Sequence, residues 1–527
     1  MDSNNDNPRL HLFVDDHELV SRSRVERVIG RPRKHPAPVV QQDRPWESPW
    51  IYAWGSVLRC PDSGRLRMWY GTTGAGSQLA FQRTCYAESG DGIHWEKPTL
   101  GLYEALGFKD TNIMAVTAAV HSVEAADSVM GECGARRRVP GPGLEDFATH
   151  LDGVNVVLDP SEPDPQKRYK FLGCLWRNDD QGGHSHNLLS SPDGIHWNMP
   201  PEKLMQVNDG TTVEWDPIRK VWMLGWLSSQ VIDSGENVRY AELSESPDLR
   251  AWTPVGKPFE LDEEDDYGRA LQGHFLHPFV YGDQYLGFYS AIHSKEGWVQ
   301  TYLVTSRDGR SWERPLRRDP LIGLGAEGQF DEDSVDTAIN SPILIGDDLY
   351  IYYCGRARRH WAGVAATGAI GLARLKRDRF AGLANGGWFN RDCNNNVSND
   401  GEVVTRPVSV TGPMLYINAR SRQVPRRTLI PDASLSDFEE QDLQAGDLWG
   451  TVRVELLDEN QDPIPGYSLE ECHPIRDDAV RIPVRWQSRE DVEELEARTI
   501  CVRFRLNMAT LYAYTFDERP VETGHAG

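Results

Sequence analysis

The sequence predicts an all-β fold, with a five-bladed β-propeller over residues 1–385 and a C-terminal β-sandwich over residues 400–520. Three observations lead to this prediction. A hairpin motif occurs four times, a pair of strands occurs five times, and helical periodicity is nearly absent. Units of roughly four short strands, about 50 to 100 residues apart, are typical of propellers.

The first repeated element is a short motif with Ser, Asp and Trp at fixed offsets. Asp-Gly between two alternating apolar stretches favours a tight turn, and the Trp that follows can pack on neighbouring strands. Each copy is therefore expected to form the outer hairpin of one small sheet. The copies are residues 89–95, 191–197, 246–252 and 306–312, and the third has Leu249 where the others have Gly.

The second repeated element is an apolar strand, a turn and an aromatic strand. It occupies residues 53–70, 155–172, 211–225, 275–289 and 340–353. After the fifth unit, residues 371–380 replace the hairpin motif. An early strand at residues 11–14 is expected to complete the last blade and close the ring.

The C-terminal part reads differently. Residues 385–400 are rich in Gly, Asn and Asp, which is typical of a linker. Alternating apolar residues then recur with turn residues about every ten positions, which predicts a β-sandwich. This part carries no obvious chemistry, so we expect it to stabilise the propeller.

Charge and cysteine content exclude several classes of protein. The chain of 527 residues has 56 basic and 79 acidic side chains, a net charge of −23. This surplus works against a nucleic-acid partner or an anionic membrane, because phosphate binding needs clustered Lys and Arg. The 8 Cys form no CxxC pair and are expected to be reduced thiols. A polar start and the lack of a long apolar run predict a cytoplasmic protein without a membrane span.

The repeats also predict where a site would lie. In a propeller, the first strand of every blade begins at one shared pocket near the axis. Aligning these strands places Asp152 and Asp209 at the same position on adjacent blades. Carboxylates on other blades are then expected nearby, and the catalytic candidates are Asp152, Asp209, Glu214, Asp333 and Asp336. The substrate-binding candidates are Glu47, Trp54, Arg239, His274, His277 and Asp331.

Clustered carboxylates suit the cleavage of a glycosidic bond. That reaction needs one protonated acid for the leaving oxygen and one ionised carboxylate as nucleophile or base. It needs no organic cofactor. Two other interpretations stay open at this stage: the ring of carboxylates holds a structural Ca²⁺ ion, or the Asp-Gly pairs form only turns. Glu214 either faces the channel as a candidate acid or packs between blades.

Motifs in the fifth unit add a resemblance to a known family. Phe330-Asp331 and Tyr352-Tyr353-Cys354-Gly355, with the four hairpins and the trailing sandwich, resemble the glycoside hydrolase family 32 and 43 superfamily. Residues 12–16, 91–98 and 100–102 resemble more closely a set of poorly characterised bacterial relatives of the family 32 N-terminal domain. The resemblance implies a glycosidase, a hydrolase of carbohydrate metabolism, that uses two Asp and one Glu.

The chain also departs from that superfamily. Its first inner strand, residues 51–57, has no carboxylate, so the usual nucleophile position is empty unless Glu47, Asp15 or Asp16 reaches it. Arg318-Asp319-Pro320 occurs, but it follows the fourth hairpin and is expected to lie far from the pocket. The sequence therefore also fits two functions besides a glycosidase: a non-catalytic carbohydrate-binding propeller, and a propeller enzyme acting on a glycosylated small metabolite.

Two further segments are ambiguous. The insertion at residues 120–150 contains Arg136-Arg137-Arg138 and is either a lid, a subunit contact of a homo-oligomer or a solvated loop. His184 and His186 alternate on an expected strand. They form either a metal-binding pair, a sugar contact or one polar strand face.

Overall fold

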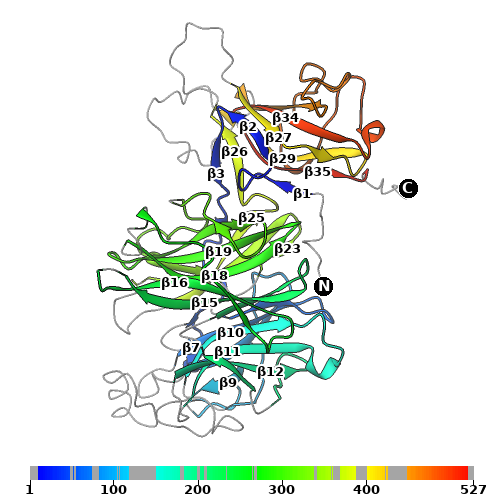
Figure 1. The fold of residues 1–527 in the computed structure, drawn as a ribbon. Helices are drawn as coiled ribbons and strands as arrows, with labels where there is room; N and C mark the ends of the chain where they lie inside the picture. Colours follow the sequence, from blue (N-terminus) through cyan, green and yellow to red (C-terminus); the bar gives the residue numbers. More distant parts are fainter. Residues whose placement is uncertain are drawn as a thin grey trace, which may run out of the picture. The chain divides into compact units, whose positions relative to one another are not determined.

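The computed structural model describes residues 10–47, 51–52, 55–73, 82–103, 105, 107–117, 150–177, 183–198, 202–206, 211–232, 234–263, 265, 270–317, 319–337, 341–357, 359, 368–386, 400–421, 423–424 and 448–519. The regular elements in these ranges are β-strands and short 3-10 turns (Figure 1). The predicted all-β fold class is therefore confirmed for the described part of the chain. None of the described helical turns is long and apolar enough to span a membrane.

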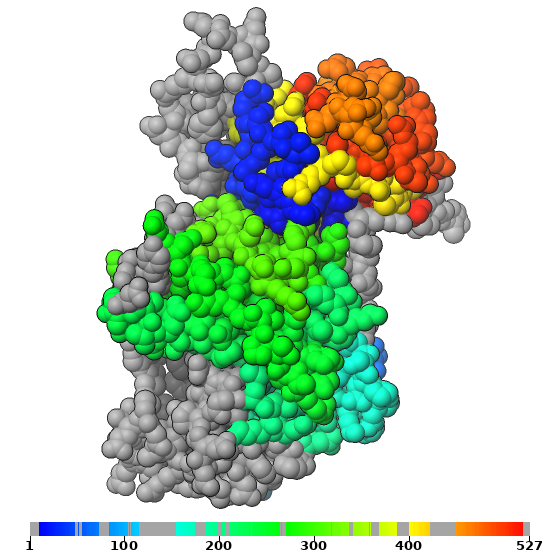
Figure 2. Space-filling view, viewed as in Figure 1, coloured from blue at the N-terminus to red at the C-terminus, as the bar shows by residue number. Residues whose placement is uncertain are grey.

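Contacts divide the chain into two compact units. Among the described residues, unit 1 runs from Pro32 to Leu375, and unit 2 contains residues 10–31 together with the residues from Lys376 onward. Unit 2 is thus built from both ends of the chain. In Figure 2, its blue N-terminal residues lie against the yellow residues that follow unit 1.

Unit 1 is made of small antiparallel sheets whose strands follow one another in chain order. The first sheet contains β5 (Ile51–Tyr52), β6 (Val57–Arg59), β7 (Leu66–Thr73), β8 (Gln82–Ser89) and β9 (Ile113–Thr117). The second contains β10 (His150–Leu158), β11 (Tyr169–Arg177), β12 (Gly183–Ser191) and β13 (Glu202–Gln206). The third contains β14 (Thr211–Asp216), β15 (Val221–Val231), β16 (Asn237–Ser246) and β17 (Thr253–Gly256).

Two further groups of strands complete unit 1. The fourth sheet contains β18 (Leu271–Tyr281), β19 (Gln284–His293), β20 (Val299–Ser306) and β21 (Trp312–Glu313). The fifth contains β22 (Ser334–Thr337), β23 (Ile343–Ile345), β24 (Asp348–Arg356), β25 (Gly368–Lys376) and β4 (Arg33–Lys34). A parallel contact between β20 and β22 joins these two groups into one nine-stranded sheet.

The hairpin motif lies between the last two strands of its sheet, in line with the outer hairpin predicted from the sequence. Asp91 Oδ1 accepts hydrogen bonds from the backbone N–H groups of Ile93 and His94, both 2.8 Å long, and Ser89 Oγ accepts from Gly92 N at 2.8 Å. The other copies repeat the Asp contacts. Gly92 has a φ of 79°, a left-handed conformation that glycine adopts without strain, whereas the third copy places Leu249 there with a φ of 65°.

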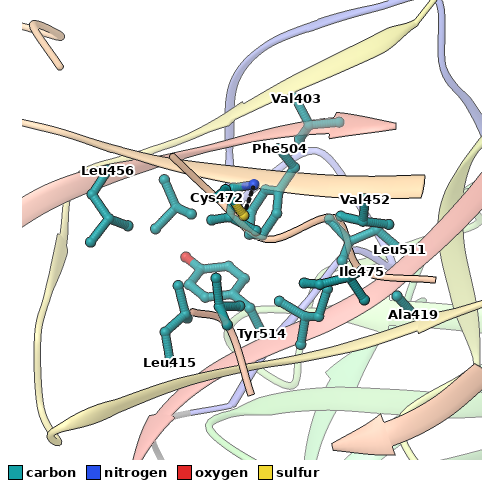
Figure 3. Close-up of a cluster of buried hydrophobic side chains, with 14 of the residues drawn as sticks. Val403, Leu415, Ala419, Val452, Leu456, Cys472, Ile475, Phe504, Leu511 and Tyr514 are labelled. Carbon is teal, nitrogen blue, oxygen red and sulfur yellow. Dashed lines mark hydrogen bonds between the residues drawn. The ribbon is translucent and has the colours of Figure 1, made fainter. Parts of the chain in front are cut away.

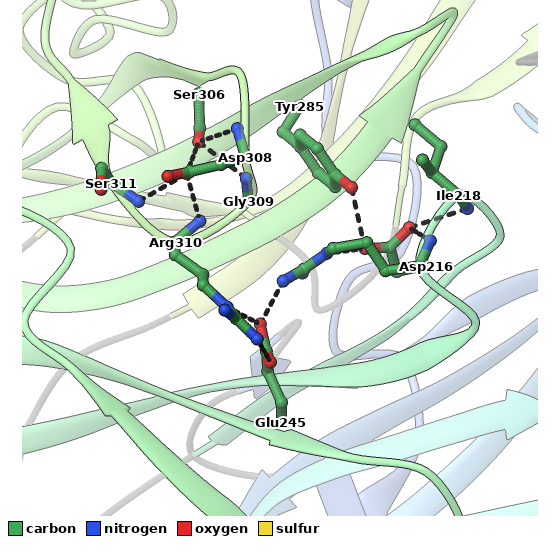
Figure 4. A network of polar contacts seen from close by, with 10 residues as sticks. Asp216, Ile218, Glu245, Tyr285, Ser306, Asp308, Gly309, Arg310 and Ser311 are labelled. Atoms are coloured by element: carbon green, nitrogen blue, oxygen red, sulfur yellow. Dashed lines mark hydrogen bonds and ion pairs between the residues drawn. The ribbon is translucent and has the colours of Figure 1, made fainter.

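Each motif turn also docks on a neighbouring sheet. Trp69 of the first sheet donates its indole N–H to Gly194 O of the second sheet at 2.8 Å, and Tyr352 of the fifth sheet donates to Gly92 O of the first at 2.8 Å. Figure 4 shows the fourth copy, where Arg310 binds Glu245 of the third sheet. In the same view, Tyr285 donates to Asp216 at 3.0 Å. The last sheet and the first are therefore linked in the same way as consecutive sheets.

Apolar side chains fill the spaces between the sheets. Separate buried clusters join the first and second sheets, the second and third, and the third and fourth. Another cluster joins the first sheet to the fifth, and it includes Met68, Tyr70, Tyr352 and Ile370. Burial of large aromatic residues is the main favourable term in such interfaces, about 1.5–3 kcal/mol for each side chain.

Unit 2 has two antiparallel sheets around one apolar core. One sheet contains β1 (Leu10–Leu12), β3 (Glu26–Ile29), β26 (Ala381–Asn385), β29 (Met414–Ser421), β33 (Asp478–Pro483) and β35 (Ala509–Asp517). The other contains β2 (Leu19–Ser23), β27 (Gly401–Thr405), β28 (Val408–Ser409), β32 (Thr451–Leu457) and β34 (Thr499–Asn507). A short pair, β30 (Gln423–Val424) and β31 (Leu448–Trp449), lies apart. The core packs Phe504, Tyr514 and Leu415 together (Figure 3).

The expectation for residues 11–14 is wrong. This segment does not complete the last sheet of unit 1, because β1 pairs with β35 in unit 2. Phe13 is fully buried in the unit 2 core, with its ring 5.8 Å from that of Phe504. The outer strand of the fifth sheet is instead β4, where Lys34 pairs with Ala373. The apolar segment thus enters a core, and the basic pair Arg33-Lys34 takes the edge.

The Gly92 turn gives a direct test of the link between the fifth and first sheets. A Cβ on Gly92 would lie 2.7 Å from Tyr352 Oη, whereas a Cβ on Gly90 in the same turn would meet nothing within 4 Å. We expect Gly92→Ala to lower the free energy of unfolding by about 2–4 kcal/mol through left-handed strain and overpacking. Gly90→Ala should change it by less than about 0.5 kcal/mol. Equal effects in urea denaturation would contradict this packing.

Candidate functional site

Three of the predicted site residues fall outside what can be described. The backbone of Asp152 lies in β10, opposite Cys174, but its side chain is outside the described residues. Asp209 and Trp54 are also outside them. The proximity of Asp152 and Asp209 therefore stays a prediction.

Side-chain hydrogen bonds reach the first strand of a sheet from the sheet that precedes it in the chain. Asn155 in β10 donates to Thr211 O at 2.8 Å. Thr212 Oγ1 in β14 donates to Leu276 O in β18 at 2.5 Å. The fifth sheet is fixed by Thr301 Oγ1, which donates to Val335 O in β22 at 3.0 Å. Glu214, His277 and Asp336 are therefore carried by neighbouring first strands.

Glu214 is a partly exposed carboxylate held by the fourth sheet and by the segment between β22 and β23. Its Oε2 lies 3.3 Å from His277 Nε2, and accepts from Ser341 N at 3.2 Å and from Ser341 Oγ at 2.8 Å. The side chain is 24% exposed, whereas that of His277 is 1% exposed. Within the described residues, Oε1 of Glu214 has no hydrogen-bond partner.

Asp336 forms a second carboxylate–histidine pair. Its Oδ1 lies 2.9 Å from His274 Nδ1, and its Oδ2 accepts from Arg356 at 2.9 Å. The Asp336 side chain is fully buried, and the arginine compensates for its charge. His274 sits at a β-bulge, because the pairing of β18 with β19 shifts between Gly273 and Phe275. Bulges of this kind re-aim a side chain and often occur beside active sites.

Asp331 and Asp333 precede β22 and have different contacts. Asp331 is 1% exposed, and its Oδ2 accepts from Lys34 at 2.6 Å and from Tyr353 Oη at 2.9 Å. Burial lowers the pKa of Lys34, and the Asp331 carboxylate opposes that shift. These contacts fasten β4 to the fifth sheet. The backbone carbonyl of Asp333 accepts a hydrogen bond from Val299 N at 3.2 Å. Its side-chain Oδ1 lies 3.8 Å from Arg359 Nε.

Glu47 is fully buried in a polar network of the first sheet. It accepts from Tyr70 Oη at 2.5 Å, from Lys97 at 2.8 Å and from the N–H groups of Asp43 and Arg44 at 3.1 Å. Burial, together with the Cys85 thiol and the Glu47 carboxylate, raises the pKa of Tyr70. All these partners belong to the fold, so a substrate contact by Glu47 stays a prediction.

Arg239 is the remaining predicted contact. It lies in β16 opposite Ser229 and is half-buried. Two residues of the site were not anticipated from the sequence, Ser341 and Arg356. Arg356 could have been found, because it follows the Tyr352–Gly355 motif directly and lies opposite Ser334, diagonal to Asp336 on the same pair of strands. Ser341 has no comparable signal, because it comes from an irregular segment.

Metal binding receives no support from the described side chains. They contain no group of three or more His, Cys, Asp or Glu placed to hold an ion. Of the suggested histidine pair, the side chain of His184 lies outside the described residues. His186 is fully buried, with Nε2 3.2 Å from Thr211 Oγ1, and burial lowers its pKa to about 3.

His186 predicts a measurable pH dependence of stability. Its pKa is about 3 in the folded chain and about 6.5 when exposed, so its contribution is complete above pH 6.5 and falls as the pH drops toward 3. Between pH 7.5 and 5.5, it should account for about 1.4 kcal/mol of lost stability. We expect His186→Gln to remove this part in urea denaturation, and His35→Gln, at a partly exposed histidine, to keep it. An unchanged pH dependence in His186→Gln would contradict the assignment.

No protein-family model matches this sequence, and no curated protein does. The protein is similar to the solved structure of an RGII complex of BT0996, with 14% identity, a TM-score of 0.45, and coverage of 66% of this chain and 92% of that one. It is also similar to the structure of an N-acetylgalactosamine deacetylase from F. plautii in complex with blood group B trisaccharide. The identity is 14%, the TM-score is 0.42, and the match covers 68% of this chain and 97% of that one. A third similar structure is that of a thermostable family-43 glycoside hydrolase. The identity is 12%, the TM-score is 0.39, and the match covers 62% of this chain and 92% of that one. At these identities and TM-scores, the likenesses carry no argument about activity.

Proposed function

We propose that unit 1 is a five-bladed β-propeller that cleaves a glycosidic bond with carboxylates near its axis, and that unit 2 is a β-sandwich. The chain order of the five sheets supports the propeller. So does the Tyr352 to Gly92 hydrogen bond, which links the last sheet to the first. A closed ring of this kind gathers the first strands around one pocket.

The observation that best supports this function is the arrangement of the Glu214 carboxylate, which is both anchored and partly exposed. One oxygen of its carboxylate is held by fixed donors, and the other has no partner among the described residues. A carboxylate that is anchored and partly exposed can reach a ligand without first rearranging. Most other carboxylates described above, such as Asp331 and Glu47, have both oxygens or their whole side chain committed to the fold.

In the proposed reaction, two carboxyl groups divide the work. One protonated carboxyl gives its proton to the leaving oxygen, and one ionised carboxylate attacks the anomeric carbon or activates water. Glu214 takes one of these roles, and Asp152 or Asp209 the other. Asp336 acts as a buried charge that holds His274 at the pocket. Asp333 remains a further candidate, and the substrate is a carbohydrate or a glycosylated small molecule.

One observation favours a second function, carbohydrate binding without cleavage. The first inner strand contributes no carboxylate, since β5 and β6 together read Ile-Tyr and Val-Leu-Arg. A propeller with an incomplete set of acids could bind a glycan and leave it intact. Binding and turnover must therefore be measured separately.

We expect Glu214→Gln to lower kcat on a cleaved glycoside by roughly 10²-fold or more, because it removes the ionisable oxygen. The assay is release of nitrophenol from a panel of nitrophenyl glycosides. Asp209→Asn should abolish turnover as well, and Glu313→Gln, on a strand at the edge of the fourth sheet, should leave it unchanged.

Unchanged turnover in Glu214→Gln would remove this residue from the mechanism. Binding of glycans by calorimetry, with no turnover by the wild type on any member of the panel, would favour the second function. Circular dichroism and thermal unfolding of each variant check that a lost activity is not a lost fold.

A further inference from the structure

We propose that His277 is a positioning residue for Glu214, and that the imidazole and Ser341 together hold Oε2 so that Oε1 alone is presented to a ligand. The kinetic consequence rests on the proposed function, whereas the hydrogen-bonding arrangement does not. His277 then serves the pocket through Glu214 rather than by touching substrate.

The geometry concentrates three donors on a single oxygen. His277 Nε2, Ser341 N and Ser341 Oγ all lie within 3.3 Å of Oε2. They come from β18 and from the segment between β22 and β23, while Glu214 itself belongs to β14. Three elements thus converge on one end of the carboxylate. Such convergence fixes both the rotamer and the plane of the carboxylate, which a single contact would not do.

The surroundings of His277 explain why its ring can act as a fixed donor. The side chain is 1% exposed and lies edge-on to two buried rings, Phe279 at 6.0 Å and Phe288 at 6.4 Å between centroids. The ring therefore has little freedom to turn away from Glu214. Its burial also separates it from bulk solvent, and so from direct contact with a ligand that reaches Glu214.

The hydrogen bonds also select one tautomer of His277. Its Nδ1 is buried and has no partner among the described residues. A proton on Nδ1 would leave a buried N–H donor unsatisfied, which is costly. A proton on Nε2 is instead donated to Oε2 of Glu214. The Nε2–H tautomer therefore satisfies the most groups.

The tautomer is tested without any enzymatic assay. In the full chain labelled with ¹⁵N-histidine, long-range ¹H–¹⁵N spectra at pH 7.5 should show the Nε2–H pattern for His277, assigned by its loss in His277→Gln. Glu214→Gln should shift the His277 signals, and Ser341→Ala should shift them less. An Nδ1–H pattern, or signals that do not respond to Glu214→Gln, would overturn the proposal.

Kinetics test the positioning role on a cleaved glycoside. His277→Phe keeps a ring but has no donor, and it should lower kcat about tenfold or more with KM within about twofold. His277→Gln keeps an N–H at a similar reach and should recover most of kcat. His186→Gln is the matched control, because His186 is also fully buried and also has one hydrogen bond among the described residues. This variant should leave kcat unchanged.

Full kcat in His277→Phe would show that the ring acts only as packing. Equal losses in His277→Phe and His277→Gln would show that the N–H donor does not account for the effect. Either result would overturn the proposal. If the wild type cleaves nothing, the proposed function fails while the spectra still decide the role of His277. If the spectra show the Nδ1–H tautomer in an active enzyme, the positioning role fails and the glycosidase proposal stands.

Discussion

The docking of each sheet against the next is the constraint on which unit 1 depends. A small antiparallel sheet has two faces and cannot bury both alone, so each face must meet a neighbour. Buried aromatic residues provide most of the apolar area between the sheets. The glycines in the hairpin turns let the neighbouring sheet approach closely. Gly194 lies against Trp69, and Gly92 lies against Tyr352, with no room for a side chain at either place. Because the same contact joins the last sheet to the first, the series of described sheets is covered at both of its ends.

That constraint also creates the site. Packed sheets bring the first strands together, and hydrogen bonds from Asn155, Thr212 and Thr301 join the first strands of the third, fourth and fifth sheets to the preceding sheet. Side chains from strands far apart in the sequence then meet, as Glu214 meets His277 and Ser341. Rigid elements hold such groups more accurately than mobile loops can. The bulge at His274 is a local departure from the regular sheet, and it lies where His274 contacts Asp336.

The sequence predicts the repeats well because they are local. Serine, aspartate and glycine at fixed offsets determine one turn, and the turn does not depend on distant residues. The partners of a side chain are a different matter. Glu214 could be placed on a first strand, but nothing in the sequence joins it to Ser341, which lies 127 residues away. Residues 11–14 show the same limit, since an apolar strand fits any open core, and here unit 2 provides one through Phe13.

The split of unit 2 between the two ends of the chain has a consequence for biosynthesis. During translation, β1, β2 and β3 leave the ribosome first, yet their partners β26, β27 and β35 come hundreds of residues later. Unit 1 is, in chain terms, an insertion within a discontinuous domain. The early segment must therefore stay without its strand partners until β26, β27 and β35 have been synthesised. Its many charged residues, such as Arg22, Arg24 and Glu26, help to keep the segment soluble in the meantime, because charged side chains hinder pairing with the wrong strands.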